Sequence, residues 1–160
     1  MKRPTNKEMH KIAVNKVIEY EKRKRSGSKP KELHEGEVYD IETESRFIEV
    51  KSQWKDGLPS FVVISQTEKF WEVMPKKARK YYIYSLFNLK DKAKLMIIPP
   101  ELIFSETMRT GKTDAGAILS SFRRAFLNEV SIESEIRLII RPNKLYTDSK
   151  EDYNLKIVNL

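Results

Sequence analysis

The chain has 160 residues and no cysteine, and its 31 Lys and Arg residues outnumber its 23 Asp and Glu residues, giving a formal net charge of +8. This length suits a single domain with a core of its own, and the lack of cysteine excludes disulfides, thiolate metal sites and cysteine nucleophiles. No stretch approaches the roughly 18 apolar residues of a membrane span, and no hydrophobic signal region follows the first residues. We therefore expect a soluble, intracellular, cytoplasmic protein with no membrane partner.

The first predicted element is a helix over residues 6–25. Thr5 and Glu8 have the spacing of a capping box, and apolar residues then recur at helical intervals. The Ser-Gly-Ser-Lys-Pro stretch at 26–30 ends the helix, because glycine and proline do not continue it. His10, one of two histidines, is interpreted as a residue of the helix surface.

Positive charge gathers at the end of this helix, where four cations follow one another: Lys22, Arg23, Lys24 and Arg25. Such a run attracts a polyanion, because each neutralised phosphate releases condensed counterions. Cations also suit the negative C-terminal end of a helix dipole, so a solvated helix end explains the same run. From charge alone both interpretations stay open. If the run has a partner, nucleic acid is the partner that these four residues would bind.

Short runs rich in β-branched and aromatic residues then predict strands. The first two, 38–42 and 46–51, flank a polar turn and predict a hairpin, and a third strand is predicted over 61–65. Apolar positions at helical spacing predict a second helix over 67–80. The remaining predicted elements are strands over 81–87 and 93–98, a helix from residue 114, and late strands over 137–140 and 155–158.

This order of elements predicts an α+β (α/β-like) fold in which a mixed central sheet is flanked by helices. We expect residues 1–100 to form the core of the domain. Residues 101–160 would add a helix and strands packed on the same domain, and they carry no motif that indicates a function. Whether the protein forms a homodimer stays open.

The predicted hairpin places charged side chains close together. If its loop consists of residues 44–45, Asp40 lies directly across from Glu49, where Cβ atoms are about 4.5–5.5 Å apart and like charges are destabilising. Glu49 and Lys51 are two residues apart and share one face of their strand, while Ile48 and Val50 point the other way, into the core. The result is a carboxylate pair beside an ammonium.

This group of charges suits metal-assisted hydrolysis of a phosphodiester. Two close carboxylates offer oxygen ligands to Mg²⁺, which would neutralise their repulsion and lower the pKa of a bound water. A nearby ammonium can stabilise charge on a phosphate. An ordinary solvent-facing hairpin with a Glu-Lys pattern explains the same residues, because the turn at 44–45 does not strongly specify the register.

The sequence around the hairpin resembles known families. Asp40, followed nine residues later by Glu49-Val50-Lys51, is similar to the D...(D/E)-x-K core of the PD-(D/E)XK nuclease superfamily. Over residues 6–90 the chain also resembles the protein NO VEIN C-terminal domain, a domain of unknown function. The residues that carry this likeness are Glu8, Ala13, Val17, Tyr20 and Glu21 on the first helix, then Tyr39 to Glu42, Phe47 to Lys51, and Ile64 to Glu68. Val38 and Ser65 depart from the family pattern, which often has Gly and Thr there, and neither is a presumed ligand.

The resemblance implies a restriction-endonuclease-like fold with residues 1–100 as a nuclease-like core. It also implies that Asp40 and Glu49 bind Mg²⁺ or Mn²⁺ and that Lys51 assists the attack on the phosphodiester. Glu8 matches the first-helix glutamate of the family, which in the superfamily supports the metal. The capping box explains Glu8 equally well.

Three further residues are weaker candidates for the site: Gln53, Gln66 and Glu68. Gln53 follows the core lysine and could reach a substrate. Gln66 and Glu68 begin the second predicted helix, where a carboxylate also favours the positive end of the helix dipole. A structural role is therefore the leading interpretation for these last two residues.

We expect a metal-dependent nuclease that hydrolyses phosphodiester bonds in nucleic acid, with DNA favoured over RNA and with either endonuclease or exonuclease action. The first alternative is an inactive module of the same fold that binds nucleic acid through Lys22 to Arg25 without a metal ion. The second is a protein-interaction module that uses residues 81–87 as an exposed edge strand.

Overall fold

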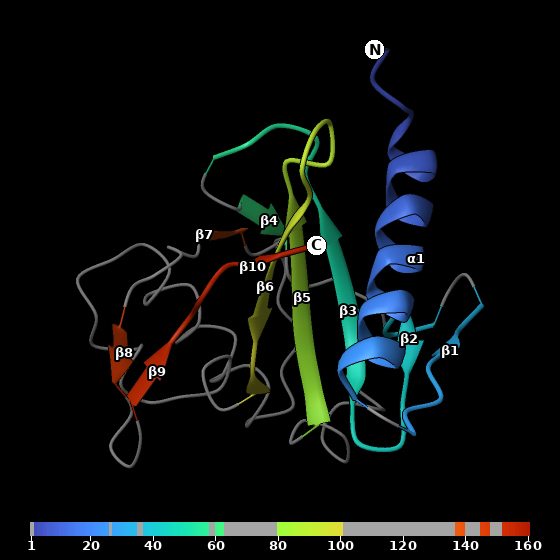
Figure 1. Cartoon of the computed structure of the whole chain (residues 1–160), viewed down its shortest axis with the longest axis vertical. Helices are drawn as coiled ribbons and strands as arrows, with labels where there is room; N and C mark the ends of the chain where they lie inside the picture. The colour runs from blue at the N-terminus through green and yellow to red at the C-terminus, as the bar shows by residue number, and fades with distance from the viewer. Residues whose placement is uncertain are drawn as a thin grey trace.

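In the computed structural model, the α-helix found among the described residues packs against a six-stranded mixed sheet (Figure 1). The structure describes residues 2–25, 27–34, 37–57, 60–62, 80–100, 137–139, 145–147 and 152–160. The helix is α1 (Asn6–Lys24). The strands of the sheet, in spatial order, are β1 (Lys31–Glu32), β2 (Ile41–Glu42), β3 (Phe47–Ser52), β5 (Tyr81–Phe87), β6 (Lys94–Ile98) and β10 (Val158–Asn159). The expected α+β fold, with a mixed central sheet flanked by a helix, is confirmed.

Two smaller sheets stand apart from this one. They are β4 (Ser60–Val62) with β7 (Arg137–Ile139), and β8 (Leu145–Thr147) with β9 (Asp152–Asn154). The strand expected over 61–65 is thus present in part as β4, and β7 confirms the strand expected over 137–140. The strand expected over 155–158 is misplaced, because the chain leaves β9 in one sheet and joins β10 in another between those residues. The helices expected over 67–80 and from residue 114 lie outside the described residues, apart from Lys80.

The helix α1 begins at the predicted capping box. The Thr5 hydroxyl accepts a hydrogen bond from the Glu8 N–H at 3.2 Å, and the Glu8 carboxylate accepts one from the Thr5 N–H at 2.7 Å. The helix ends at Lys24, and Gly27 then adopts a φ of 82°, which glycine tolerates without strain. Along the described residues, no helix is both long and apolar enough to span a bilayer. The helix buries one face, formed by Met9, Ala13, Val14, Val17 and Glu21.

The predicted hairpin is formed by β2 and β3. Both Cα pairs between the two strands match the register expected for a loop at residues 44–45. Side chains alternate along β3, so Ile48 and Val50 enter the core that α1 covers. Glu49 and Lys51 therefore project from the opposite face of the sheet.

The strand β5 lies in the interior of the sheet, where it pairs in parallel with β3 and antiparallel with β6. Six of its seven residues are buried. The expectation that residues 81–87 form an exposed edge strand is therefore wrong. An apolar sequence shows that a segment is buried, but it does not show whether strands or a partner protein cover it.

The C-terminal end of the chain returns to the same sheet. The strand β10 pairs with β6, and the Leu160 N–H donates to the Ala93 carbonyl at 3.0 Å. In Figure 1 the C-terminus lies beside the central strands, while the N-terminus lies beyond the first turn of α1. The last residues thus complete the unit that begins with α1.

Candidate functional site

Asp40 lies just before β2, where the hairpin opens. Its Oδ2 accepts a hydrogen bond from the Val50 N–H at 2.7 Å, and its Oδ1 lies 3.1 Å from Nε2 of His10 on α1. Because β2 has only two residues, this carboxylate takes the place of a backbone carbonyl beside β3. Asp40 therefore joins α1, β2 and β3 at one point.

The position of Asp40 differs from the expected pairing with Glu49. The Asp40 N–H donates to the Ile48 carbonyl at 2.9 Å, and Ile48 is already the Cα partner of Ile41. Two residues of one strand thus face one residue of the other, as in a β-bulge. The sequence argument assumed regular pairing through Asp40, and a bulge of this kind leaves no mark on hydrophobic alternation.

Glu49 and Lys51 form an ion pair on the face of β3 that points away from α1. Lys51 Nζ lies 3.0 Å from Glu49 Oε1, and the Glu49 side chain is 18% exposed. Burial raises the pKa of Glu49 to about 7; the Lys51 ammonium opposes this rise and the charge of Asp40 adds to it. Near neutral pH Glu49 is thus close to half-protonated, and an additional cation beside it would favour its charged form.

His10 is a site residue that the sequence interpretation missed. Its side chain is 45% exposed, yet it contacts Asp40, and this hydrogen bond raises the pKa of the imidazole against the opposing effect of burial. The two residues are 30 positions apart in the chain, so only the packing of α1 on the hairpin brings them together. The available signal was that His10 precedes the core residue Val14 by one helical turn and so shares its side of the helix.

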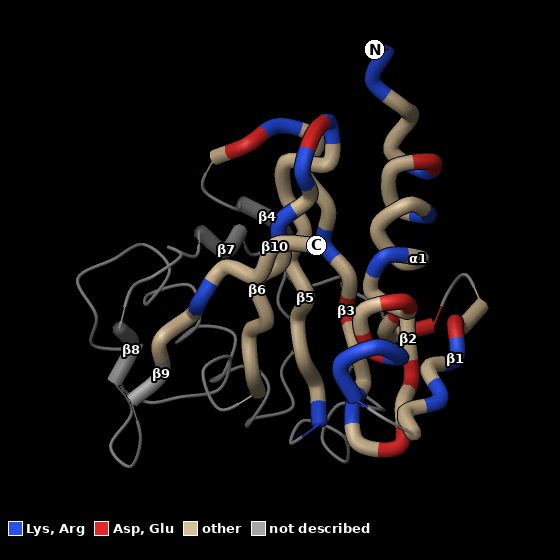
Figure 2. Tube along the Cα trace, viewed as in Figure 1, with Lys and Arg blue, Asp and Glu red and all other residues tan. Residues whose placement is uncertain are grey.

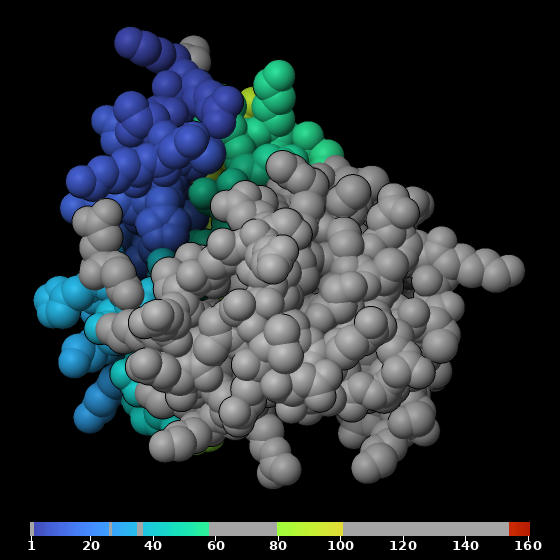
Figure 3. Space-filling view, turned by 180° about the vertical axis from the view of Figure 1, so that it is seen from behind, coloured from blue at the N-terminus to red at the C-terminus, as the bar shows by residue number. Residues whose placement is uncertain are grey.

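A cavity of about 450 Å³ lies next to Asp40, between α1 and the segment that leads to β2. Lys7 and Lys11 of α1 line one side, and His34 and Tyr39 line the other. Figure 3 shows α1 (blue) and residues 28–34 (light blue) at the surface of this flank. The volume falls within the range of small-ligand pockets, so there is room for part of a substrate beside Asp40.

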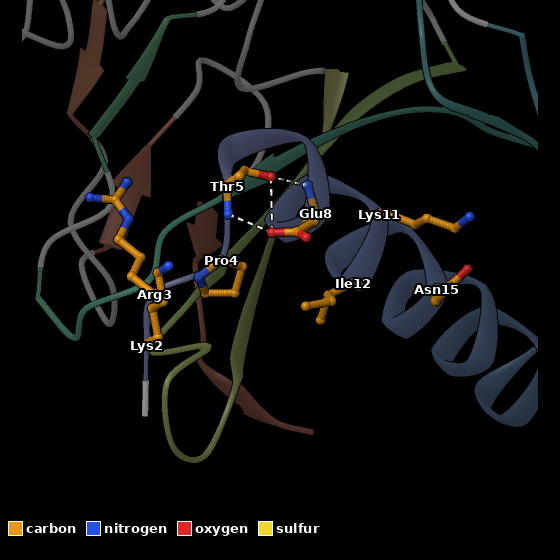
Figure 4. A pocket seen from close by; sticks show the side chains of 8 residues that line it. All are labelled: Lys2, Arg3, Pro4, Thr5, Glu8, Lys11, Ile12 and Asn15. Carbon is orange, nitrogen blue, oxygen red and sulfur yellow. Dashed lines mark hydrogen bonds between the residues drawn. The ribbon is translucent and has the colours of Figure 1, made fainter.

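Glu8 lies apart from Asp40 and Glu49, in the capping role. Its Oε2 accepts from both the N–H and the hydroxyl of Thr5, and these hydrogen bonds lower the pKa of Glu8. Figure 4 shows Glu8 in a second hollow, of about 710 Å³, that Lys11 also lines. Since residues two apart point about 200° from each other around a helix, Glu8 and His10 face different sides of α1.

The structure separates the four cations predicted to bind nucleic acid. Lys22, Arg23 and Lys24 are exposed. Arg25 is engaged instead: its Nε lies 3.1 Å from the Glu21 carboxylate, and its guanidinium donates to the hydroxyl of Ser45 in the hairpin loop. Figure 2 shows Lys and Arg residues gathered at this end of α1, beside the loop that joins β2 to β3.

The weaker candidates do not join these residues within the described part of the chain. The Gln53 N–H donates to the Leu86 carbonyl at 2.8 Å, and its side-chain amide donates to the Lys55 carbonyl at 3.2 Å. The first bond ties Gln53 to β5, and the second ties it to the turn that follows β3. Gln66 and Glu68 lie outside the described residues.

The carboxylates of Asp40 and Glu49 are the oxygen donors that a divalent cation would use here. Mg²⁺ is commonly held by one or two carboxylates, with waters and substrate phosphates completing its coordination. Within the described ranges, no three His, Asp or Glu side chains are grouped so as to hold a metal ion.

Comparison with known protein families tests the resemblance to the NO VEIN C-terminal domain that the sequence showed. The family model described as Protein NO VEIN, C-terminal matches residues 9–98. The chain belongs to this family. The matched residues include His10, Asp40, Glu49 and Lys51, whereas Glu8 precedes the matched region. No curated protein and no solved structure gives a significant match.

The resemblance to the NO VEIN C-terminal domain is thus confirmed. The region matched extends from the first turns of α1 to the end of β6, and so contains the hairpin and the two central strands. The matched model names this family and not the PD-(D/E)XK superfamily. The wider assignment therefore stays a prediction for this NO VEIN C-terminal domain.

Proposed function

We propose that this NO VEIN C-terminal domain is a metal-dependent nuclease that hydrolyses phosphodiester bonds, with DNA favoured over RNA. The proposal is carried by one observation: Glu49 and Lys51 lie 3.0 Å apart and Glu49 is close enough to Asp40 to be affected by its charge. We name these three residues the hairpin site. Burial and the charge of Asp40 raise the pKa of Glu49 to about 7 against the opposing effect of Lys51. A divalent cation would relieve this unfavourable placement of two carboxylates.

Each residue of the hairpin site has a role in this proposal. Asp40 and Glu49 would hold Mg²⁺ or Mn²⁺, which when bound supplies an acidified water and stabilises charge on the phosphate. The Val50 N–H and His10 fix the direction of the Asp40 carboxylate, whose oxygens keep further lone pairs. The Lys51 ammonium, now 3.0 Å from Glu49, would donate to a substrate phosphate oxygen as its new acceptor.

The test is a calorimetric titration with Mn²⁺ and a parallel DNA cleavage assay, comparing the wild type with an Asp40→Asn, Glu49→Gln double variant. Both amides keep the shape of the side chains and remove the charges. We expect Mn²⁺ binding to disappear and cleavage to fall about 100-fold or more, because charge stabilisation of the reaction is lost. A folded double variant that cleaves at the wild-type rate would contradict the proposal.

The matched control is a Glu19→Gln, Asp91→Asn double variant. Both residues are exposed, one on α1 and one in the turn between β5 and β6, so the control loses the same number of negative charges away from the hairpin site. It should bind Mn²⁺ and cleave as the wild type does. Equal losses in both double variants would point to net charge rather than to the hairpin site.

A second candidate function is nucleic-acid binding without catalysis. It is favoured by the pairing of the charged groups in the site, Asp40 with His10 and Glu49 with Lys51, which the fold maintains without a metal ion. This candidate predicts salt-sensitive binding in EDTA through the end of α1. A wild-type protein that binds DNA in EDTA but neither binds Mn²⁺ nor cleaves would favour it over the nuclease.

A further inference from the structure

The last turn of α1 carries three exposed cations, Lys22, Arg23 and Lys24, which we name the helix-end patch. None of the ion pairs found among the described residues involves them. Arg25, the fourth cation of the run, is held by Glu21 and the hairpin loop and does not belong to the patch. The patch is therefore available to an anionic partner.

A buried network fixes the helix-end patch relative to the hairpin. Glu21, one residue before the patch, is 0% exposed, and its carboxylate lies 3.1 Å from Nε of Arg25. The same carboxylate accepts a hydrogen bond from the Tyr84 hydroxyl of β5. Arg46, just before β3, donates to that hydroxyl at 2.6 Å. If this end of α1 moved away from the sheet, the buried Glu21 carboxylate would lose its partners. The patch therefore keeps a fixed distance from the hairpin site.

Helix geometry gives the distance between the patch and the hairpin site. His10 contacts Asp40, and the patch occupies the positions 12 to 14 residues later on the same helix, which corresponds to about 18–21 Å along its axis. Successive phosphates of one strand of B-form DNA advance about 3.4 Å along the duplex axis. The spacing thus equals the rise of about five or six base-pair steps along the duplex axis.

From this geometry we infer that the helix-end patch is a second contact for the phosphate backbone of a nucleic acid, about five or six base-pair steps along the duplex axis from the scissile bond. The position of the scissile bond rests on the proposed function, whereas the contact itself needs no cleavage. Because consecutive helix residues point about 100° apart, one strand meets two of the three side chains at a time. The remaining cation faces solvent.

The helix dipole offers another explanation for cations at this position. Positive charge near a helix C-terminus stabilises the helix whether or not a ligand is present. That effect changes the melting temperature of the free protein and leaves the affinity for nucleic acid untouched. The two explanations can therefore be separated by measuring binding and stability on the same variants.

The experiment measures the affinity for a fluorescent DNA duplex by anisotropy in EDTA, at several salt concentrations from 50 to 200 mM. The variant is Lys22→Gln, Arg23→Gln, Lys24→Gln. The matched control, Lys55→Gln, Lys90→Gln, Lys92→Gln, removes the same charge at exposed positions in the turns after β3 and after β5. Figure 2 shows those turns at the opposite end of the sheet from the helix-end patch.

Each phosphate contact contributes about 0.9 to the slope of log affinity against log salt. We expect the patch variant to lose about two contacts, so that a fourfold rise in salt weakens its binding about twelvefold less than that of the wild type. The control should keep the wild-type slope. An unchanged slope in the patch variant, or equal losses in patch variant and control, would overturn the inference.

The spacing is tested by cleavage of end-labelled duplexes that carry one uncharged methylphosphonate. We expect the wild type to cut less at bonds about five or six base-pair steps along the duplex axis from the modification, and the patch variant to lose this minimum. A minimum elsewhere would overturn the spacing. Absence of cleavage in both proteins would contradict the nuclease function, while the salt slope, which needs no cleavage, would still decide the contact.

Discussion

At the scale of single residues, Glu49 makes the stability of the domain depend on pH. Its pKa rises from 4.5 to about 7 in the folded protein, chiefly through burial, so the folded state binds a proton more tightly than the unfolded chain. The free energy of unfolding should therefore fall, by about 2–3 kcal/mol, as the pH rises from about 4.5 to about 7. The Glu49→Gln variant should lose this dependence and be more stable than the wild type near pH 8.

Urea unfolding in EDTA, near pH 5 and near pH 8, measures this difference, since EDTA removes divalent cations that would favour the charged form of Glu49. The matched control is Glu19→Gln, which removes an exposed carboxylate from α1. It should keep the wild-type difference between the two pH values. If Glu49→Gln keeps it as well, the pKa of Glu49 is not raised.

The residues of the candidate site were predictable to different degrees. Asp40, Glu49 and Lys51 lie close in the chain, and a hairpin with a short loop brings them together through local geometry alone. Helical spacing places His10 on the core side of α1, but its contact with Asp40 was not predictable, because that contact depends on how α1 packs across a separation of 30 residues. Glu8 fitted two interpretations, and the capping interaction that the structure shows is the one that its spacing to Thr5 specifies.

At the scale of elements, Glu21 joins α1 to the sheet through a buried charge. Its carboxylate is 0% exposed and interacts with Arg25, Arg46 and Tyr84. The Glu21→Ala variant should lose about 3 kcal/mol of unfolding free energy, because it leaves the buried hydroxyl of Tyr84 and two half-buried arginines without their anion. Chemical denaturation measures this loss. Glu19→Ala, at an exposed position of the same helix, should change stability by no more than about 0.5 kcal/mol; equal effects would contradict the structural role of Glu21.

Element boundaries followed from the sequence where local chemistry sets them. The capping box starts α1, Gly27 follows its end, and the Pro99-Pro100 pair follows β6. The boundary of β2 was less predictable, because an irregularity at Asp40 shortens the strand that alternation had extended to residue 38. The pairing of β4 with β7 joins distant segments, and no local pattern specifies such a partner.

At the scale of the whole molecule, the interior position of β5 predicts where exchange of backbone hydrogens is slowest. The strand pairs on both sides and most of its residues are buried, so its amides should exchange only through global unfolding. The edge strand β1 has two exposed residues and should exchange much faster. Hydrogen exchange followed by NMR or mass spectrometry tests this order. Exchange in β5 as fast as in β1 would contradict the sheet order.

The fold class was predictable because apolar alternation and helical spacing identify α1, β3, β5 and β6 independently of one another. The order of strands was not, because it depends on which backbone edges meet once the chain collapses. The parallel pairing of β3 with β5 illustrates this point. Both strands could be recognised in the sequence, but their adjacency requires a connection that crosses from one end of the sheet to the other.

The hydrogen bond between Asp40 and Val50 also protects the protein against self-association. Beyond the short strand β2, the backbone of β3 would offer a free donor to a strand from a second molecule, and exposed donors of this kind promote aggregation. Asp40 occupies that donor at 2.7 Å and adds a negative charge beside it. A small apolar side chain at position 40 would uncover the edge, so such a variant would self-associate at high concentration. Asparagine keeps the acceptor oxygen, and it is therefore the substitution that removes the charge while leaving the edge closed.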